Sequence, residues 1–196
     1  MKVGIFGGSF NPVHLGHYEI VREVLNRQLV EKMIIVPAYQ NPLKAQTPIL
    51  PEKLRWKMLE KTFACFDQLE ISDFEIKQKQ LSYTYKTLDF YQTQLPNAQF
   101  FLIMGADAFK LFHKWSNPDK ILSRTQLIVF PRPKQTQAEK PIHSPIAPNK
   151  IHWINYHIPE ISATEIRNTS FDQLKKVPML HPDIMELWKS NLGDCH

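Results

Sequence analysis

Cysteine is scarce in this sequence and long apolar runs are missing, and both absences exclude whole classes of protein. Only Cys65 and Cys195 occur among 196 residues, which excludes a disulfide framework and a cysteine-rich metal site. No stretch approaches the ~20 apolar residues of a membrane span, and no apolar signal region follows the amino terminus. We therefore expect a globular cytoplasmic protein without a membrane anchor.

A concentrated basic segment is also missing, although the chain as a whole is basic. The formal net charge is +5, but lysine and arginine are spread along the sequence. A mildly basic surface explains this distribution better than nucleic-acid binding, and basic residues around a pocket for an anionic small molecule are compatible with it. With 43% hydrophobic and 22% charged residues, the composition is that of an ordinary globular domain.

Short apolar runs alternate with helix-like segments along the chain. We predict strands at 2–6, 33–36, 69–72, 99–104, 126–130 and 151–154, and helices at 15–29, 52–66, 82–94, 107–114, 118–123, 162–168 and 182–191. This alternation is typical of a parallel sheet with right-handed crossovers. We expect one doubly wound α/β domain over residues 1–196, with a flexible loop at 132–150 and a C-terminal helical segment at 162–191.

The junction after the first predicted strand carries small residues and then two histidines. In a parallel sheet, free N–H groups at such a junction can hold a phosphate. The glycine spacing fits neither the dinucleotide fingerprint G-x-G-x-x-G nor the P-loop G-x-x-x-x-G-K-[ST]. His14 and His17 can share one face of a helix and donate to phosphoryl oxygens. A metal pair lacks a third ligand nearby in sequence, and a surface histidine beside a capping one is the structural alternative.

A second polar element lies near the carboxyl end. Ser162 followed by Glu165 predicts a capping box, which stabilises a helix start by about 1 kcal/mol. The same helix start can also bind an anion, and Thr164 and Arg167 could supply a hydroxyl and a guanidinium to a triphosphate. We favour phosphate binding, with capping as a concurrent role.

Both elements resemble motifs of the nucleotidyltransferase superfamily. Residues 8–17, Gly-Ser-Phe-Asn-Pro-Val-His-Leu-Gly-His, are similar to its signature G-[ST]-F-[DN]-P-x-[HT]-x-G-H. Residues 161–167 are similar to its I-S-[ST]-T-x-I-R motif, from which Ala163 departs. The resemblance implies a Rossmann-like nucleotidyltransferase fold and transfer of a nucleotidyl group with release of pyrophosphate. It further implies that ATP is contacted by Gly8, Ser9, Phe10, Ser162 and Thr164, and that His14, His17 and Arg167 are catalytic.

Weaker elements in the middle of the chain resemble the nicotinate mononucleotide adenylyltransferases. Asn41-Pro42-Leu43-Lys44 is similar to their P-x-H-K loop, with Leu43 in place of histidine, and residues 82–88 are similar to S-Y-T-x-x-T-L. Gly105-Ala106-Asp107, with Trp115 beyond it, is similar to a third motif, in which Ser116 replaces a frequent aromatic residue. The resemblance implies that Lys44 is catalytic, that Arg132 contacts phosphate or adenine, and that the nicotinate nucleotide is bound by Asn11, Thr84, Asp107 and Trp115.

Structural alternatives exist for these middle residues. Ser82 is predicted as the N-cap of its helix, Asp107 could be no more than an N-cap, and Trp115 could be a core residue. Within the resemblance, the start of the helix at 82–94 would bind the carboxylate of nicotinate and give no such benefit to a neutral carboxamide.

Taken together, these motifs predict an enzyme that joins nicotinate mononucleotide to the AMP part of ATP, giving deamido-NAD and pyrophosphate in NAD biosynthesis. We expect Mg²⁺ to accompany ATP, and we expect no metal held by the protein and no nucleic-acid or membrane partner. The acceptor phosphate is already an anion, so no general base is needed and catalysis rests on alignment and charge stabilisation. The alternatives are an enzyme acting on nicotinamide mononucleotide or phosphopantetheine, and a nucleotide-binding regulator without turnover.

Overall fold

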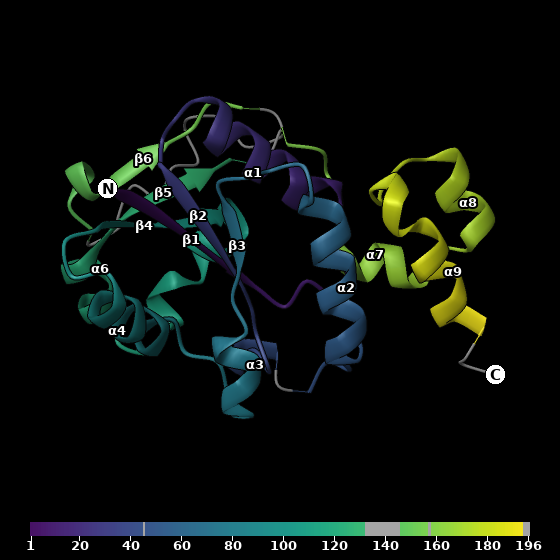
Figure 1. The fold of residues 1–196 in the computed structure, drawn as a ribbon, viewed down its shortest axis with the longest axis horizontal. Helices are drawn as coiled ribbons and strands as arrows, with labels where there is room; N and C mark the ends of the chain where they lie inside the picture. Colours follow the sequence, from purple (N-terminus) through teal and green to yellow (C-terminus); the bar gives the residue numbers. More distant parts are fainter. Residues whose placement is uncertain (45, 132–145, 157, 194–196) are drawn as a thin grey trace.

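Parallel strands form a single six-stranded sheet in the order β3-β2-β1-β4-β5-β6 (Figure 1). In the computed structural model, which describes residues 1–44, 46–131, 146–156 and 158–193, every pair of neighbouring strands in this sheet is parallel. This order is the doubly wound one, and it confirms the predicted fold class. The strands are β1 (Lys2–Gly8), β2 (Lys32–Pro37), β3 (Leu69–Ile71), β4 (Gln99–Gly105), β5 (Thr125–Phe130) and β6 (Ile151–Trp153).

Helices connect the strands and cover both faces of the sheet. The α-helices are α1 (Leu15–Asn26), α2 (Glu52–Phe63), α3 (Phe74–Gln78), α4 (Thr84–Gln94), α5 (Ala106–Lys110), α6 (Pro118–Arg124), α7 (Ala163–Asn168), α8 (Phe171–Lys176) and α9 (Met185–Gly193). Short 3-10 turns lie at η1 (Pro42–Lys44), η2 (Phe112–Lys114), η4 (Pro148–Lys150) and η5 (Pro182–Ile184). The sequence pattern predicts neither α3 nor α8. None of the described helices is long and apolar enough to cross a membrane.

The start of α4 differs from the prediction. The helix begins at Thr84 with Tyr83 as its N-cap, so the predicted cap at Ser82 is wrong. The Ser82 hydroxyl instead accepts a hydrogen bond from the Tyr39 N–H at 2.9 Å, which ties this segment to the chain that follows β2. A partner distant in sequence has replaced the local one, since Ser82 lies one residue before the N-cap position.

Two hydrophobic cores lie on opposite faces of the sheet. Consecutive strand residues alternate between them: Phe6 and Met33 contribute to one core, whereas Ile5 and Ile34 contribute to the other. The first core is covered by α1, α2 and the C-terminal helices, and the second by α4, α5 and α6 (Figure 1). The C-terminal helices lie beyond α2, where the fully buried Trp188 of α9 joins them to the first core.

The strand order places a crevice between β1 and β4. In the sequence the strands move from β1 outward through β2 to β3 and then return to β4 on the other side of β1. The connections that leave β1 and β4 therefore diverge, and open α/β sheets bind ligands at such a switch point, outside the carboxyl ends of the strands. Gly8 and Gly105 end the two strands at this point.

Candidate active site

A cavity of about 810 Å³ lies at this switch point and brings together distant segments of the chain. Every predicted site residue that the structure describes lines it: Gly8, Ser9, Phe10, Asn11, His14, His17, Lys44, Thr84, Asp107, Trp115, Ser162, Thr164 and Arg167. Arg132 and residues 132–145 of the predicted loop lie outside the described residues. The cavity thus joins the two phosphate motifs, which are about 150 residues apart in sequence, to the segments predicted to bind the acceptor.

The two histidines interact directly at the start of α1. His14 is the N-cap, with extended backbone angles, and its N–H donates to Nδ1 of His17 at 3.2 Å. Because Nδ1 accepts this bond, the proton of a neutral His17 ring sits on Nε2. The two rings lie against each other with centroids 3.7 Å apart. A Cβ at Gly16 would come within 3.1 Å of the His14 ring, so any larger residue would have to push this ring aside by a few tenths of an ångström.

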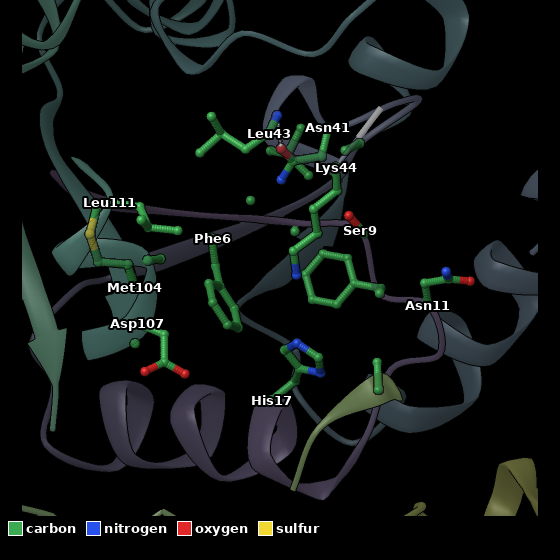
Figure 2. A pocket seen from close by; sticks show the side chains of 18 of the residues that line it. Phe6, Ser9, Asn11, His17, Asn41, Leu43, Lys44, Met104, Asp107 and Leu111 are labelled. Carbon is green, nitrogen blue, oxygen red and sulfur yellow. Dashed lines mark hydrogen bonds between the residues drawn. The ribbon is translucent and has the colours of Figure 1, made fainter. Parts of the chain in front are cut away.

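The surroundings of His17 favour its neutral form. Burial, followed by the proximity of His14 and Lys44, holds the pKa of His17 well below its ordinary value of 6.5. Phe6 and Phe10 flank the ring, with centroid distances of 5.9 and 4.9 Å. In Figure 2 the exposed Lys44 side chain extends into the pocket toward His17. His17 can therefore offer a hydrogen-bond donor to the pocket, whereas Lys44 offers positive charge.

The backbone of Phe10 forms part of the glycine-rich turn, and its ring packs in the hydrophobic core. Its φ of 43° lies in the left-handed region, which costs a non-glycine residue about 1–2 kcal/mol. The ring is 2% exposed and meets Phe6 edge-on at 5.7 Å. It also folds back over Gly8, where a Cβ would come within 3.2 Å of the ring. Core packing therefore holds this turn in a conformation that it would not adopt alone.

Arg167 connects the second motif to the first. Its Nη1 donates to the Asn11 carbonyl at 2.5 Å, and its Nη2 donates to the Thr164 hydroxyl at 3.1 Å. Ser162 is the N-cap of α7 and accepts from the Glu165 N–H at 3.1 Å, which confirms its predicted capping bond. The guanidinium is thus fixed beside the glycine-rich turn, although the chain between the two motifs passes through the whole sheet.

The Asn11 side chain is turned toward the loop that carries Lys44. Its Nδ2 donates to the Pro48 carbonyl and its Oδ1 accepts from the Leu50 N–H, both at 2.8 Å. Figure 2 shows this amide directed away from the other labelled pocket residues. Each amide atom of Asn11 thus makes one hydrogen bond to the backbone of this loop and holds it in place, and the contact with the mononucleotide stays a prediction.

At the other end of the cavity lie the segments predicted to bind the acceptor. Thr84 is the first residue of α4, and Asp107 lies in the first turn of α5, whose N-cap is Gly105 rather than Asp107. Trp115 is partly exposed and contacts Phe112, with ring centroids 5.3 Å apart. Trp115 therefore combines the core contact with a position on the cavity wall.

Glu75 also lines this end of the cavity, and sequence reasoning missed it. The residue lies in the unpredicted helix α3, is buried, and accepts from the Thr87 hydroxyl at 2.5 Å. Burial raises the pKa of the Glu75 carboxyl, and hydrogen bonds from Thr87 and Ser82 partly oppose that rise. Its polar neighbours are scattered in sequence, so no local pattern indicates that the Glu75 carboxyl is buried beside the cavity.

Arg55 is the second residue that sequence reasoning missed. It lies in α2, is fully buried, and donates to the backbone carbonyls of Ser9, Ala38 and Leu50. Burial lowers the pKa of Arg55, and Glu52 partly opposes this effect. The available signal was the position itself, because residues 55, 58, 59 and 62 share one face of the helix and all are buried.

The fold and the two phosphate motifs define a class of nucleotide-binding transferase, and a comparison of families agrees. The model described as cytidylyltransferase-like matches residues 5–169, a span that includes both motifs, so the chain belongs to the cytidylyltransferase-like family. This result confirms the superfamily resemblance that the motifs predict.

Individual related proteins show to which group within this family the chain belongs. The chain is 34% identical over 175 residues to a protein of Clostridium tetani named "Probable nicotinate-nucleotide adenylyltransferase", covering 85% of both chains. It is also 34% identical over 186 residues to the protein of that name from Flavobacterium johnsoniae, covering 95% of both. The chain therefore groups with the nicotinate-nucleotide adenylyltransferases. Its fold is similar to the nicotinic acid mononucleotide adenylyltransferase of Plasmodium falciparum solved with NaAD, with a TM-score of 0.78 at 20% identity, covering 100% and 98% of the two chains.

Proposed function

We propose that this enzyme transfers the adenylyl group of ATP to nicotinate mononucleotide, giving deamido-NAD and pyrophosphate, in NAD biosynthesis. The observation that carries the proposal is the single cavity in which the His14–His17 pair and Arg167 face the segments around Thr84 and Trp115. Membership among the nicotinate-nucleotide adenylyltransferases supports the same reaction. A neighbour in fold has been solved with NaAD, the product that this reaction would form.

In the proposed reaction an oxygen of the mononucleotide phosphate attacks the α-phosphorus of ATP. A new bond forms between that oxygen and the α-phosphorus, the bond from the α-phosphorus to the bridging oxygen breaks, and pyrophosphate leaves with the electron pair. The attacking phosphate is already an anion at neutral pH, so no side chain has to remove a proton. Alignment of the two substrates and stabilisation of the developing charge then supply the rate enhancement.

Four side chains divide the work of stabilisation. Lys44 and Arg167 supply positive charge to the triphosphate, and His17 supplies a neutral donor from Nε2. His14 is set against His17 by ring contact and helps to hold the same phosphates. Gly8, Ser9 and Phe10 contribute backbone to the phosphate site, and Ser162 and Thr164 line the same cavity.

The acceptor end favours an acid over an amide. Thr84 opens the 11-residue helix α4, whose first N–H groups favour a carboxylate and offer no such benefit to a carboxamide. Trp115 stacks on the pyridine ring and Asp107 lines the mononucleotide site. Leu43 faces the same cavity with 46% of its surface exposed, so this chain presents an apolar wall at a position where related enzymes often carry histidine.

The divalent ion is proposed to arrive with ATP. Among the residues that the structure describes, no group of three or more histidine, cysteine or acidic side chains is placed to hold a metal. We assign Mg²⁺ to the triphosphate oxygens, where it would neutralise phosphate charge.

We also propose that residues 1–196 act as one domain, to which the segment 162–191 contributes Arg167. Location in the cytoplasm stays a prediction.

The proposal is tested by pyrophosphate release from ATP with nicotinate mononucleotide, nicotinamide mononucleotide and phosphopantetheine as separate acceptors. The expected order places nicotinate mononucleotide first in kcat/KM, with phosphopantetheine inactive. Preference for the amide would move the proposal to the alternative acceptor. Release with none of the three, from a protein that still binds ATP, would favour a nucleotide-binding regulator.

A further inference from the structure

Arg55 is a charged residue inside the hydrophobic core, and its hydrogen bonds lead to the glycine-rich turn. Its Nη1 donates to the Ser9 and Ala38 carbonyls, both at 2.8 Å, and its Nε donates to the Leu50 carbonyl at 3.2 Å. Ser9 belongs to the turn after β1, Ala38 follows β2, and Leu50 lies just before α2. Arg55 therefore joins three backbone segments near the cavity.

Fold stability alone does not account for an arginine at this position. A buried guanidinium whose hydrogen bonds are incomplete is less favourable than a well-packed apolar side chain of similar volume. Nη2 of Arg55 is buried and has no hydrogen-bond partner among the described residues. The neighbouring buried positions on the same face of α2, Met58 and Leu59, are apolar. An unsatisfied buried donor of this kind calls for a reason outside packing.

The geometry of one peptide group supplies that reason. Ser9 and Phe10 line the cavity, whereas Arg55 is fully buried in the core behind them. The hydrogen bond from Nη1 draws the Ser9 carbonyl toward the core. In a trans peptide the carbonyl and the following N–H point in opposite directions, so the Phe10 N–H is directed toward the cavity.

The Phe10 conformation shows that this peptide needs support. Its left-handed φ of 43° is unfavourable for a phenylalanine, and rotation of the Ser9–Phe10 peptide could relieve it. Such a rotation would turn the Ser9 carbonyl, a hydrogen-bond acceptor, toward the bound phosphates. The hydrogen bond from Arg55 opposes it, and the buried Phe10 ring opposes it from the other side.

We propose that Arg55 is a positioning residue, which holds the Ser9–Phe10 peptide so that the Phe10 N–H donates to the triphosphate. The inference rests on the proposed function, because it assigns a phosphate to this turn. Asn11 assists by binding the same 48–50 segment that Arg55 contacts, so the turn and the segment leading to Lys44 are held as one unit. Arg55 itself does not touch the substrate.

The first test compares Arg55→Gln and Arg55→Lys with the control Leu59→Ala. Leu59 lies one turn further along α2, is fully buried, and belongs to the hydrophobic core. Leu59→Ala therefore weakens the packing of the same helix and leaves the three hydrogen bonds of Arg55 in place. We expect Arg55→Gln to raise KM for ATP about 10-fold or more, the order of effect of a misplaced donor, and Leu59→Ala to leave it within about twofold. Arg55→Lys keeps the positive charge but loses the planar guanidinium with its several N–H donors, so its KM for ATP should lie between those of the other two variants.

The second test reads the Phe10 amide directly in the wild-type chain, so it does not depend on a variant that folds. Labelling serine with ¹³C at the carbonyl and phenylalanine with ¹⁵N selects Ser–Phe peptides, which in this sequence are Ser9–Phe10 and Ser170–Phe171. Inorganic pyrophosphate should shift the Phe10 signal and leave Phe171, at the start of α8, unmoved. Calorimetry on the same sample measures whether pyrophosphate binds.

The outcomes separate the inference from the proposed function. Pyrophosphate binding with an unmoved Phe10 signal would overturn the role of Arg55 and leave adenylyl transfer standing. Equal increases in KM for ATP in Arg55→Gln and Leu59→Ala would overturn it as well, because both would then reflect lost stability. A chain that binds neither pyrophosphate nor ATP would contradict the proposed function itself.

Discussion

Replacing His17 by asparagine or by glutamine tests the two nitrogens of its ring individually. Nδ1 accepts from the His14 N–H at 3.2 Å, which leaves Nε2 as the donor. An asparagine places its oxygen near the position of Nδ1, so His17→Asn keeps the acceptor and loses the distal donor. A glutamine reaches further and places an N–H near the position of Nε2, so His17→Gln keeps the donor.

The expected loss of kcat follows from the neutral protonation state of the His17 ring. Because burial keeps the pKa of His17 low, the ring acts through one neutral, preorganised donor. Removing such a donor lowers kcat about 10²–10³-fold, which corresponds to about 2.7–4 kcal/mol of transition-state stabilisation. We expect this loss in His17→Asn and a loss of about 10-fold in His17→Gln, whose flexible chain holds the donor less firmly.

Folding should respond much less than turnover does. The ring contacts Phe6, Phe10 and His14, and its loss should lower the free energy of unfolding by about 1–2 kcal/mol, or Tm by roughly 2–8 °C. The assay is pyrophosphate release at saturating ATP and nicotinate mononucleotide, well below the Tm of the weakest variant. A His17→Asn enzyme within a few fold of wild type would refute the donor role, and equally large losses in both variants would assign the effect to ring packing.

Three other residues give independent predictions. Gly16→Ala should lower kcat about 10-fold, because the new Cβ would lie 3.1 Å from the His14 ring and displace it; steady-state kinetics with an unchanged kcat would contradict this. Arg167→Lys should raise KM for ATP about 10-fold, since one ammonium cannot bond the Asn11 carbonyl and the Thr164 hydroxyl and also face a phosphate; a KM equal to that of wild type would argue against this grip. Burial raises the pKa of Glu75, so the folded state holds its proton more tightly than the unfolded state and loses stability as pH rises above the unfolded pKa of about 4.3. Glu75→Gln removes that loss, and its Tm relative to wild type should rise as the pH increases from the unfolded pKa toward the raised folded pKa of Glu75; a difference independent of pH would contradict it.

The sheet and the phosphate motifs could be predicted because their signals are local. The run from residue 100 to residue 104 is apolar throughout and stops at a glycine, and β4 has nearly these bounds, Gln99–Gly105. The turn from Gly8 to His17 combines a strand end, small residues and paired histidines within one short stretch. Ser162 and Glu165 identify the start of α7 in the same way.

The hydrogen-bond partners of Arg55, Glu75 and Ser82 could not be predicted because they are distant in sequence. Arg55 bonds carbonyls up to 46 positions away, and Ser82 accepts from a backbone N–H 43 positions away. Propensity and periodicity describe neighbours along the chain, so they cannot indicate a hydrogen bond that forms only after the sheet has assembled. Asn11 could be predicted only in part. Its place in the turn was predictable, whereas the direction of its side-chain amide depended on the loop at 48–50.

Adenylyl transfer to nicotinate mononucleotide can be tested by following the phosphorus atoms of ATP. Two parallel reactions would use ATP labelled with ³²P at the α-phosphate or at the γ-phosphate, each with nicotinate mononucleotide as acceptor. We predict that the α-label enters deamido-NAD, that the γ-label enters pyrophosphate, and that both appear at the same rate. An α-label that stays in free nucleotide, or a γ-label that moves to the mononucleotide, would contradict it.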